Sequence, residues 1–338
     1  LILPLACPAY IIAYVYADIF EYGGYIHNSL ELLFSNKINA WPKEGIRSTI
    51  GASVILSFVL YPYIYILSRN SFIRSSQTLE ETAKILGASN ISIFLKVSLP
   101  MARPAIIGGI LLVTMEVIAD FGVADYFGLS TITTGIFRTW LSLGDRLSAL
   151  QLSAGLFIFI FFLIFLERFS RKGKVFNPDN NLVKVKRVQT KTSGYFISLF
   201  CLIPIFAGFI VPTFILFYLH NSSRNSFLDT NFIIKVFNSF YVSSIAATLA
   251  LFIAIIYIYS DRIYPNKLSK KLIEISTLGY VLPGAVIGLG VIIFLTWVDL
   301  GLSRLFLEYF GIEIGLVFTG SIAALVFGYT IRFLTIAH

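Results

Sequence analysis

Two carboxylates, Glu116 and Asp120, stand four residues apart in an apolar stretch long enough to cross a bilayer. Side chains at that spacing share one face of a helix. Because an acid near the bilayer centre costs roughly 2.5 to 3.5 kcal/mol, such residues usually face a cavity or a partner. We therefore expect the pair to line or gate a cation path, with Asp125 near the outer mouth of that path.

The alternative is a structural role for the same residues. Asp120 lies near the outer interface, where it would pair with Arg138 or cap the following loop, and Glu116 would bond to a neighbouring helix. Arg138 and Trp140 are expected to anchor the outer loop at the interface. The two roles differ in whether the negative charge itself is needed.

The other reactive residue types form no catalytic pattern. Cys7 and Cys201 each lie in an apolar run and are expected to be buried thiols. The three histidines share no ligand spacing with each other or with the cysteines, and their loop positions favour solvated imidazoles, so we expect no metal site and no catalytic residues. The sequence also contains no G-x-x-x-x-G-K-S/T loop, so we expect no cofactor in this chain and no ATP hydrolysis by it.

The composition places these residues in a membrane protein. Apolar residues make up 57% of the 338 residues and charged residues only 13%, against about 25% charged in soluble domains. The mean hydropathy of +0.82 implies more apolar surface than one core can bury, so lipid must solvate much of it. A water-soluble enzyme and a disulfide-built secreted domain are thereby excluded, and the net charge of +8 concerns membrane orientation rather than nucleic acid.

Eight apolar segments approach the roughly 20 residues that a membrane-spanning helix needs. They lie at about 1–17, 46–67, 104–123, 150–167, 195–219, 235–259, 273–298 and 313–336. Loops 68–103, 168–191 and 260–272 hold 17 of the 26 Lys and Arg residues and are therefore expected to be cytoplasmic. The predicted fold class is all-α, a polytopic transmembrane helical bundle.

An internal repeat is also expected. Leu3-Pro4-x-Ala6 recurs as Leu282-Pro283-x-Ala285, and Tyr63-Ile-Tyr-Ile-Leu67 recurs as Thr330-Ile-Arg-Phe-Leu334. The two Leu-Pro segments are six spans apart, so they run in the same direction, as in two parallel halves of a duplicated transporter. Because the chain begins and ends in apolar runs, we expect a fragment of a twelve-span protein. Its parts would be a first half over 1–167, a basic cytoplasmic linker over 168–192, and a second half over 193–338.

The cytoplasmic loop at about 76–104 carries the most specific motif. It reads Glu81-Thr82-Ala83, three residues, Gly87, nine residues, then Val97-x-Leu99-Pro100. This resembles the EAA loop of ABC importer permeases, whose pattern is E-A-A, three residues, G, nine residues, I-x-L-P; it departs at Thr82 and Val97. The resemblance implies a coupling helix that docks in a groove of a separate ATPase subunit, present in two copies.

Helix chemistry agrees with that interpretation of the loop. A helix is predicted to begin at Thr78, with Glu81 completing a capping box, and to end at Gly87, which can adopt the left-handed conformation. A second short helix is predicted over 89–97, stopped by Pro100 and Pro104. So short a pair of helices cannot bury its own apolar side chains. Those expected to face a partner are Ala83, Ile85, Leu86, Ile93 and Phe94.

Residues 115–146 resemble the ferric-iron branch of these permeases. They contain M-E-x-x-A-D-F-G, five residues and G, followed by T-x-T-T-G-I-x-R-x-W and a G-D pair. The resemblance implies two parallel repeats of the ABC importer permease (MetI-like) type in a bacterial inner membrane. A periplasmic binding protein would deliver ferric iron to loops 18–45 and 124–149, and ATP with Mg would be bound by the partner ATPase.

Two alternatives to an iron importer stay open. Related ABC permeases for thiamine, sulfate or other small solutes share the loop motif. A secondary transporter driven by an ion gradient would show the same repeat and the same intramembrane acids, but it would not need a docking helix.

Overall fold

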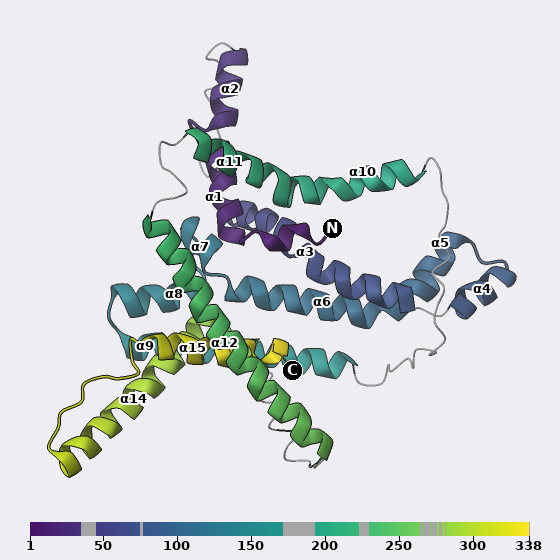
Figure 1. Ribbon diagram of the computed structural model, residues 1–338. Coiled ribbons are helices and arrows are strands. Elements are labelled where there is room, and N and C mark those ends of the chain that lie inside the picture. Colours follow the sequence, from purple (N-terminus) through teal and green to yellow (C-terminus); the bar gives the residue numbers. More distant parts are fainter. Residues whose placement is uncertain are drawn as a thin grey trace. The chain divides into compact units, whose positions relative to one another are not determined.

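The computed structural model describes residues 1–337 apart from 35–44, 75–76, 172–192, 223–229 and several positions between 264 and 281. The described residues contain helices and turns and no strand. The chain divides into two compact units, Leu1–Thr134 with Phe161–Ser223, and Gly135–Ile160 with Arg224–His338. Figure 1 shows the helices of both units. Each unit is described separately below.

The first unit is built around an antiparallel pair of long helices, α3 (Thr49–Arg74) and α6 (Leu99–Ala119), which pack along their length. Gly109 of α6 lets the two backbones approach closely, because a Cβ atom there would lie 2.8 Å from the Cα of Ile64. Small residues at such contacts are typical of helices that pack in lipid. The other elements of this unit are η1 (Leu3–Ala6), α1 (Ala9–Phe20), α2 (Tyr25–Phe34), α4 (Gln77–Ile85), α5 (Asn90–Ile93), η2 (Phe94–Ser98), α7 (Gly122–Tyr126), α10 (Ser193–Ile205), η4 (Phe206–Ile210) and α11 (Val211–Ser222).

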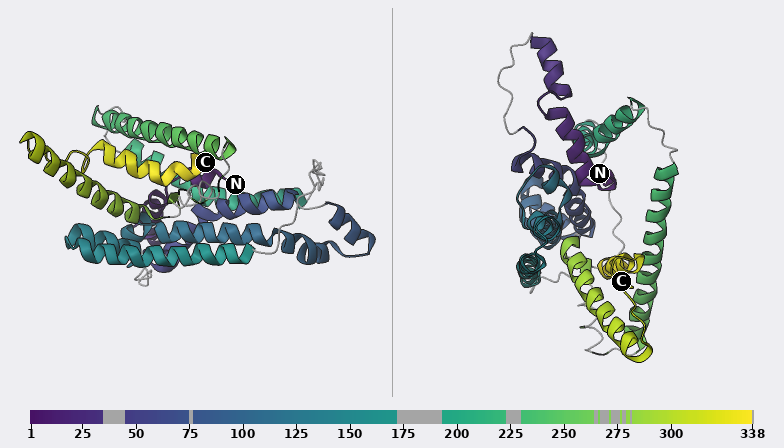
Figure 2. Two further views of the ribbon diagram at one scale, coloured as in Figure 1. Left: turned by 90° about the horizontal axis from the view of Figure 1, so that it is seen from below. Right: turned by 90° about the vertical axis from the view of Figure 1, so that its left-hand side faces the viewer.

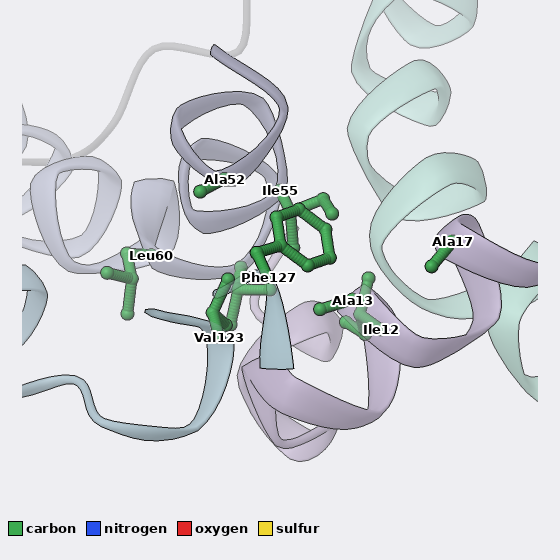
Figure 3. Close-up of a cluster of buried hydrophobic side chains, with 9 residues drawn as sticks. Ile12, Ala13, Ala17, Ala52, Ile55, Leu60, Val123 and Phe127 are labelled. Atoms are coloured by element: carbon green, nitrogen blue, oxygen red, sulfur yellow. The ribbon is translucent and has the colours of Figure 1, made fainter. Parts of the chain in front are cut away.

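A small apolar core joins α1, α3 and α7 in this unit. Ile12 and Ala13 come from α1, Ile55 from α3 and Val123 from α7, and all four are almost fully buried. Figure 3 shows these side chains converging around the ring of Phe127. The core therefore fixes the short helix α7, which follows α6, against the first helix of the chain.

A hydrogen bond from Tyr16 shows how this unit accommodates proline within lipid. The segment η4 is a π-helix in which Val211 donates its backbone N–H to the carbonyl of Phe206. The next residue, Pro212, has no N–H to offer to Ala207. The hydroxyl of Tyr16 donates to the Ala207 carbonyl instead, at 2.6 Å. A neighbouring helix thus satisfies the group that proline leaves open, as a membrane interior requires.

The second unit packs α15 (Ile322–Ala337) against both α12 (Thr230–Ile263) and α14 (Gly284–Phe310). The buried face of α12 carries Ala246, Ala250 and Ala254, spaced four residues apart. The buried carboxylate of Asp299 accepts backbone N–H bonds from Phe318, at 3.0 Å, and from Thr319, at 2.8 Å. This unit also contains η3 (Arg138–Ser142) and the first part of α9 (Arg146–Arg171), while α8 (Ile132–Phe137) begins in the first unit.

Among the described residues, six helices are long and apolar enough to cross a membrane. They correspond to six of the eight predicted segments, which confirms the all-α transmembrane class. The segment predicted at 1–17 instead forms η1 and the 12-residue α1, and the segment predicted at 313–336 forms the 16-residue α15. Asp299, which follows the predicted segment 273–298, lies inside α14, because that helix continues until Gly311 closes it at φ +67°.

Two prolines explain why α1 and α14 begin later than the predicted segments 1–17 and 273–298. Pro8 precedes α1 with φ −58° and ψ 133°, and Pro283 precedes α14 with φ −55° and ψ 140°. An extended proline with no N–H suits the position before a helix, so α14 begins eleven residues later than hydropathy predicts. Pro8 and Pro283 thus both lie immediately before a helix, whereas Pro4 lies inside η1. The duplication and the bounds of its halves remain predictions.

Other expectations about single residues need correction. Cys7 and Cys201 are free thiols, but they are half-buried rather than buried. His27, expected in a solvated loop, is 2% exposed on α2, with its ring 4.4 Å from that of Tyr22, because α2 forms where sequence suggests only a loop. Of the predicted linker at 168–192, α9 covers the part up to Arg171, and the rest lies outside the described residues.

Candidate functional site

The loop between α3 and α6 contains two short helices joined at Gly87. The N–H of Gly87 bonds to the carbonyl of Lys84 at 2.9 Å, and the N–H of Ala88 bonds to the carbonyl of Ala83 at 3.0 Å. This pair of bonds is a Schellman motif, which needs a left-handed residue at the position of Gly87. Gly87 has φ +81°, and an added Cβ would meet nothing within 4 Å. The backbone conformation, rather than lack of space, therefore selects glycine, as the sequence predicted.

The second part of the loop is continuous with α6, and the predicted stop at Pro100 is wrong. Ser89 caps α5 by accepting the N–H of Ser92 at 3.3 Å, and α5 runs through the π-helix η2 into α6. Within η2 the N–H of Leu99 bonds to the carbonyl of Phe94, five residues earlier. This wider turn relieves the clash that the Pro100 ring would make with the carbonyl four residues before it.

Two contacts tie the loop to the membrane helices: one joins α4 to η2, and the other joins η2 to α3. The hydroxyl of Ser98, buried at the end of η2, donates to the carboxylate of Glu80 at 2.8 Å. The rings of Phe72 in α3 and Phe94 in η2 stack with their centres 6.2 Å apart. Ile93, predicted to face a partner, is only 5% exposed, because it is the side chain that α5 turns inward. The loop is thus attached to both α3 and α6.

The far end of the loop presents apolar side chains that no described residue covers. Ile85 is 86% exposed, Leu86 81% and Ile91 74%. We call these three residues, with the less exposed Leu79, the apolar tip. Figures 1 and 2 show α4 and α5 extending past the ends of α3 and α6. Grouped apolar side chains on a short projecting loop are typical of a protein-binding surface.

The remaining motif residues surround the apolar tip or lie at its base. Glu81, Thr82 and Pro100 are exposed, whereas Ala83, Val97 and Leu99 are half-buried, as is Ala88 beside Gly87. The side chain of Thr78, predicted to cap α4, lies outside the described residues. Sequence reasoning missed the bond between Glu80 and Ser98, because neither residue belongs to the motif.

The second candidate site begins where α6 ends, at Asp120. Its carboxylate oxygen Oδ2 accepts the backbone N–H groups of Val123, at 3.0 Å, and Ala124, at 3.3 Å. Asp120 therefore caps the short helix α7, which confirms the capping alternative. Burial raises the pKa of the Asp120 carboxyl and Glu116 raises it further, while the two N–H bonds act in the opposite direction.

Two buried threonines hold the segment that follows. Thr133 donates its hydroxyl to the carbonyl of Ile118 at 2.6 Å, and Thr134 donates to the carbonyl of Leu129 at 3.1 Å. The last four carbonyls of a helix lack intrahelical partners, and that of Ile118 is one of them. Thr133 of the T-x-T-T motif thus closes the end of α6, while Thr134 closes the turn that begins at Leu129; the sequence predicted neither role.

The three predicted path carboxylates differ in their surroundings. Glu116 is half-buried on α6, Asp120 is engaged as a cap, and Asp125 is exposed on α7. The described part of the chain contains no group of three His, Cys, Asp or Glu side chains that could hold a metal ion.

A further charged group joins three segments near α7. Arg47, just before α3, pairs with Glu21, just after α1, with Nε to Oε1 at 3.1 Å. The Arg47 guanidinium also lies 4.9 Å from the centre of the Tyr126 ring on α7. By the predicted orientation this group lies on the outer side. Sequence reasoning missed it, since its residues lie far apart in the chain.

We expect Asp120→Asn to keep near-normal stability and Asp120→Ala to lose about 1 kcal/mol, because asparagine offers an oxygen to the same N–H groups. The thermal unfolding midpoint of the purified protein in detergent measures the difference. Equal losses in both variants would contradict the capping role.

Residues 1–172, just over half of the chain, match the family described as binding-protein-dependent transport system inner membrane component. The chain belongs to this family. Together with six long apolar helices, this shows a multi-pass permease of the inner membrane. No solved structure was found to match the chain.

Individual relatives of this permease differ in their named substrates. The chain is 28% identical to the Fe(3+)-transport system permease protein FbpB 2 of Haemophilus influenzae, over 74% of the chain and 50% of that protein. It is 33% identical to the molybdate/tungstate permease WtpB of Thermococcus kodakarensis, over 28% of the chain and 35% of that protein. A probable sulfate permease of Chlorokybus atmophyticus is 28% identical over 36% of the chain and 39% of that protein. The chain thus spans about half the length, or less, of these relatives.

Proposed function

We propose that this permease imports ferric iron, which a periplasmic binding protein delivers, and that two copies of a separate ATPase subunit drive the import. The observation that supports iron is the extent of one alignment. The Fe(3+) permease aligns over 262 residues, or 74% of the chain, and so covers segments of both units. The molybdate and sulfate permeases align over 36% or less. Import of such an oxyanion is the second candidate, supported by the names of these relatives.

The apolar tip is the proposed docking site for the ATPase, with Glu81, Thr82 and Ala83 in the adjoining helix α4 and Gly87 in the turn that ends it. The Glu80–Ser98 bond and the Phe72–Phe94 stack support a mechanical role, because a force on α4 would pass to η2, which continues into α6 and stacks on α3. Val97, Leu99 and Pro100 form the junction with α6. ATP and Mg would be bound by the partner subunits, and this chain would convert their closure into helix movement.

Glu116, Asp120 and Asp125 are proposed to line the path of the cation. Both cap bonds of Asp120 use Oδ2, so capping and a role for the charge are compatible. The double variant Glu116→Gln with Asp120→Asn tests the proposal while keeping an acceptor for α7. We expect it to lower iron uptake at unchanged membrane abundance. Normal uptake would remove both residues from the path.

The test of the substrate is uptake by cells that lack their own importers. These cells would express the full-length protein with its ATPase and binding protein, and would be given radioactive ferric iron, molybdate or sulfate. We expect saturable, ATP-dependent iron uptake. Uptake of molybdate or sulfate without iron would favour the second candidate. Uptake that needs no ATPase would favour an ion-gradient-driven transporter.

A further inference from the structure

Arg332 is the single charged residue of α15 and the eleventh residue of this 16-residue apolar helix. A cation at such depth costs several kcal/mol unless it meets a partner or a polar cavity. The Nε atom of Arg332 is buried and has no hydrogen-bond partner among the residues that the structure describes. The ring of Phe333, with its centre 5.7 Å from the guanidinium carbon, contributes a cation–π contact but no negative charge. The residue therefore needs a further partner.

The guanidinium lies against the first residue of α14. A Cβ at Gly284 would come within 2.8 Å of Nη1 of Arg332, so the guanidinium occupies the space that a side chain would fill. The N-terminus of a helix carries a positive partial charge of about half an elementary charge. Two positive groups thus lie together inside an apolar unit, and they repel each other unless an anion lies between them or beside them.

A cavity of about 440 Å³ between α14 and α15 opens onto this pair. Glycines at 284, 288 and 328 form part of its wall, and Ser321, Tyr329 and Arg332 supply polar groups. None of the described residues that line it is Asp or Glu. Its volume is within the range of small-ligand sites. The cavity therefore combines room, positive charge and hydrogen-bond donors.

We propose that the cavity between α14 and α15 binds a tetrahedral oxyanion, held by the guanidinium of Arg332 beside the N-terminus of α14. Guanidinium groups bind such anions with paired, charge-assisted hydrogen bonds. The oxyanion has two sources: a free ion of the sulfate or phosphate type, or the phosphate of an anionic lipid headgroup. This site is separate from the ATPase-coupling loop.

Equilibrium dialysis of the full-length protein in detergent, with radioactive sulfate and phosphate as probes, tests the free-ion source. We expect saturable binding that Arg332→Gln weakens at least tenfold. Arg332→Lys should weaken it less, because lysine keeps the positive charge but lacks the planar guanidinium that donates paired hydrogen bonds. Gly284→Ala keeps the charge but displaces the guanidinium, so we expect an intermediate loss. The matched control is Arg304→Gln, which removes an exposed cation from α14 and should leave binding unchanged.

Native mass spectrometry after addition of phosphatidylglycerol tests the lipid source. Retention of one lipid that Arg332→Gln abolishes, without sulfate or phosphate binding, would assign the site to a headgroup. Equal binding of every probe by the wild type and Arg332→Gln, or no binding of any, would overturn the proposal. Iron uptake in the same variants separates the two proposals, because loss of anion binding with normal ATP-driven uptake leaves the transport proposal intact.

Discussion

Gly87→Val is expected to abolish ATP-driven uptake and binding of the ATPase while the membrane helices remain folded. Gly87 has φ +81°, and a β-branched residue there is strongly strained, at a cost of about 1 to 3 kcal/mol. The loop can relieve this strain only by opening the Schellman turn, which displaces the apolar tip relative to α6. Copurification of the ATPase and uptake per permease molecule in the membrane measure the effect.

Gly87→Asn is the matched control for this experiment. Asparagine tolerates the left-handed conformation, so we expect ATPase binding and uptake within about twofold of the wild type. A Cβ at this position meets nothing within 4 Å, so neither Val nor Asn is expected to clash at its Cβ atom. The contrast between the two variants therefore isolates the backbone conformation. Equal behaviour of Val and Asn would show that the turn at Gly87 is not needed for coupling.

The features that the sequence predicted correctly are local ones. The end of α4 at Gly87 follows from a glycine after a short amphipathic segment, and the exposure of Ile85 and Leu86 follows from a loop too short to bury them. Six long helices follow from hydropathy, because lipid imposes a minimum length on any spanning segment. Each of these depends on neighbours within one turn or one span.

The features that it missed depend on contacts between distant segments or on hydrogen-bond register. Ile85 and Ile93 are both apolar residues of the same short loop, and the sequence predicted that both face a partner. Packing buries Ile93 and leaves Ile85 exposed. The π-helix before Pro100 shifts the register so that the proline does not end the helix. Arg332 is visible in the sequence as a lone cation, but its buried Nε and its contact with Gly284 appear only when α14 and α15 pack.

Leu86→Asp should weaken binding of the ATPase about a hundredfold, because an apolar anchor worth about 2 kcal/mol is replaced by a carboxylate that docking must desolvate. Leu86 is 81% exposed, so the variant should unfold at the same temperature as the wild type. The control is Leu33→Asp, which makes the same chemical change at a 75% exposed leucine of α2, away from the loop.

Titration of the detergent-solubilised permease with its ATPase measures affinity for both variants. Normal binding by Leu86→Asp would show that the apolar tip is not the docking surface. Equal weakening by both variants would show that added negative charge, rather than the lost apolar contact, causes the effect. Loss with Leu86→Asp alone, at unchanged thermal stability, would place the ATPase on α4. The Glu80–Ser98 bond and the Phe72–Phe94 stack would then be the route by which its movement reaches the membrane helices.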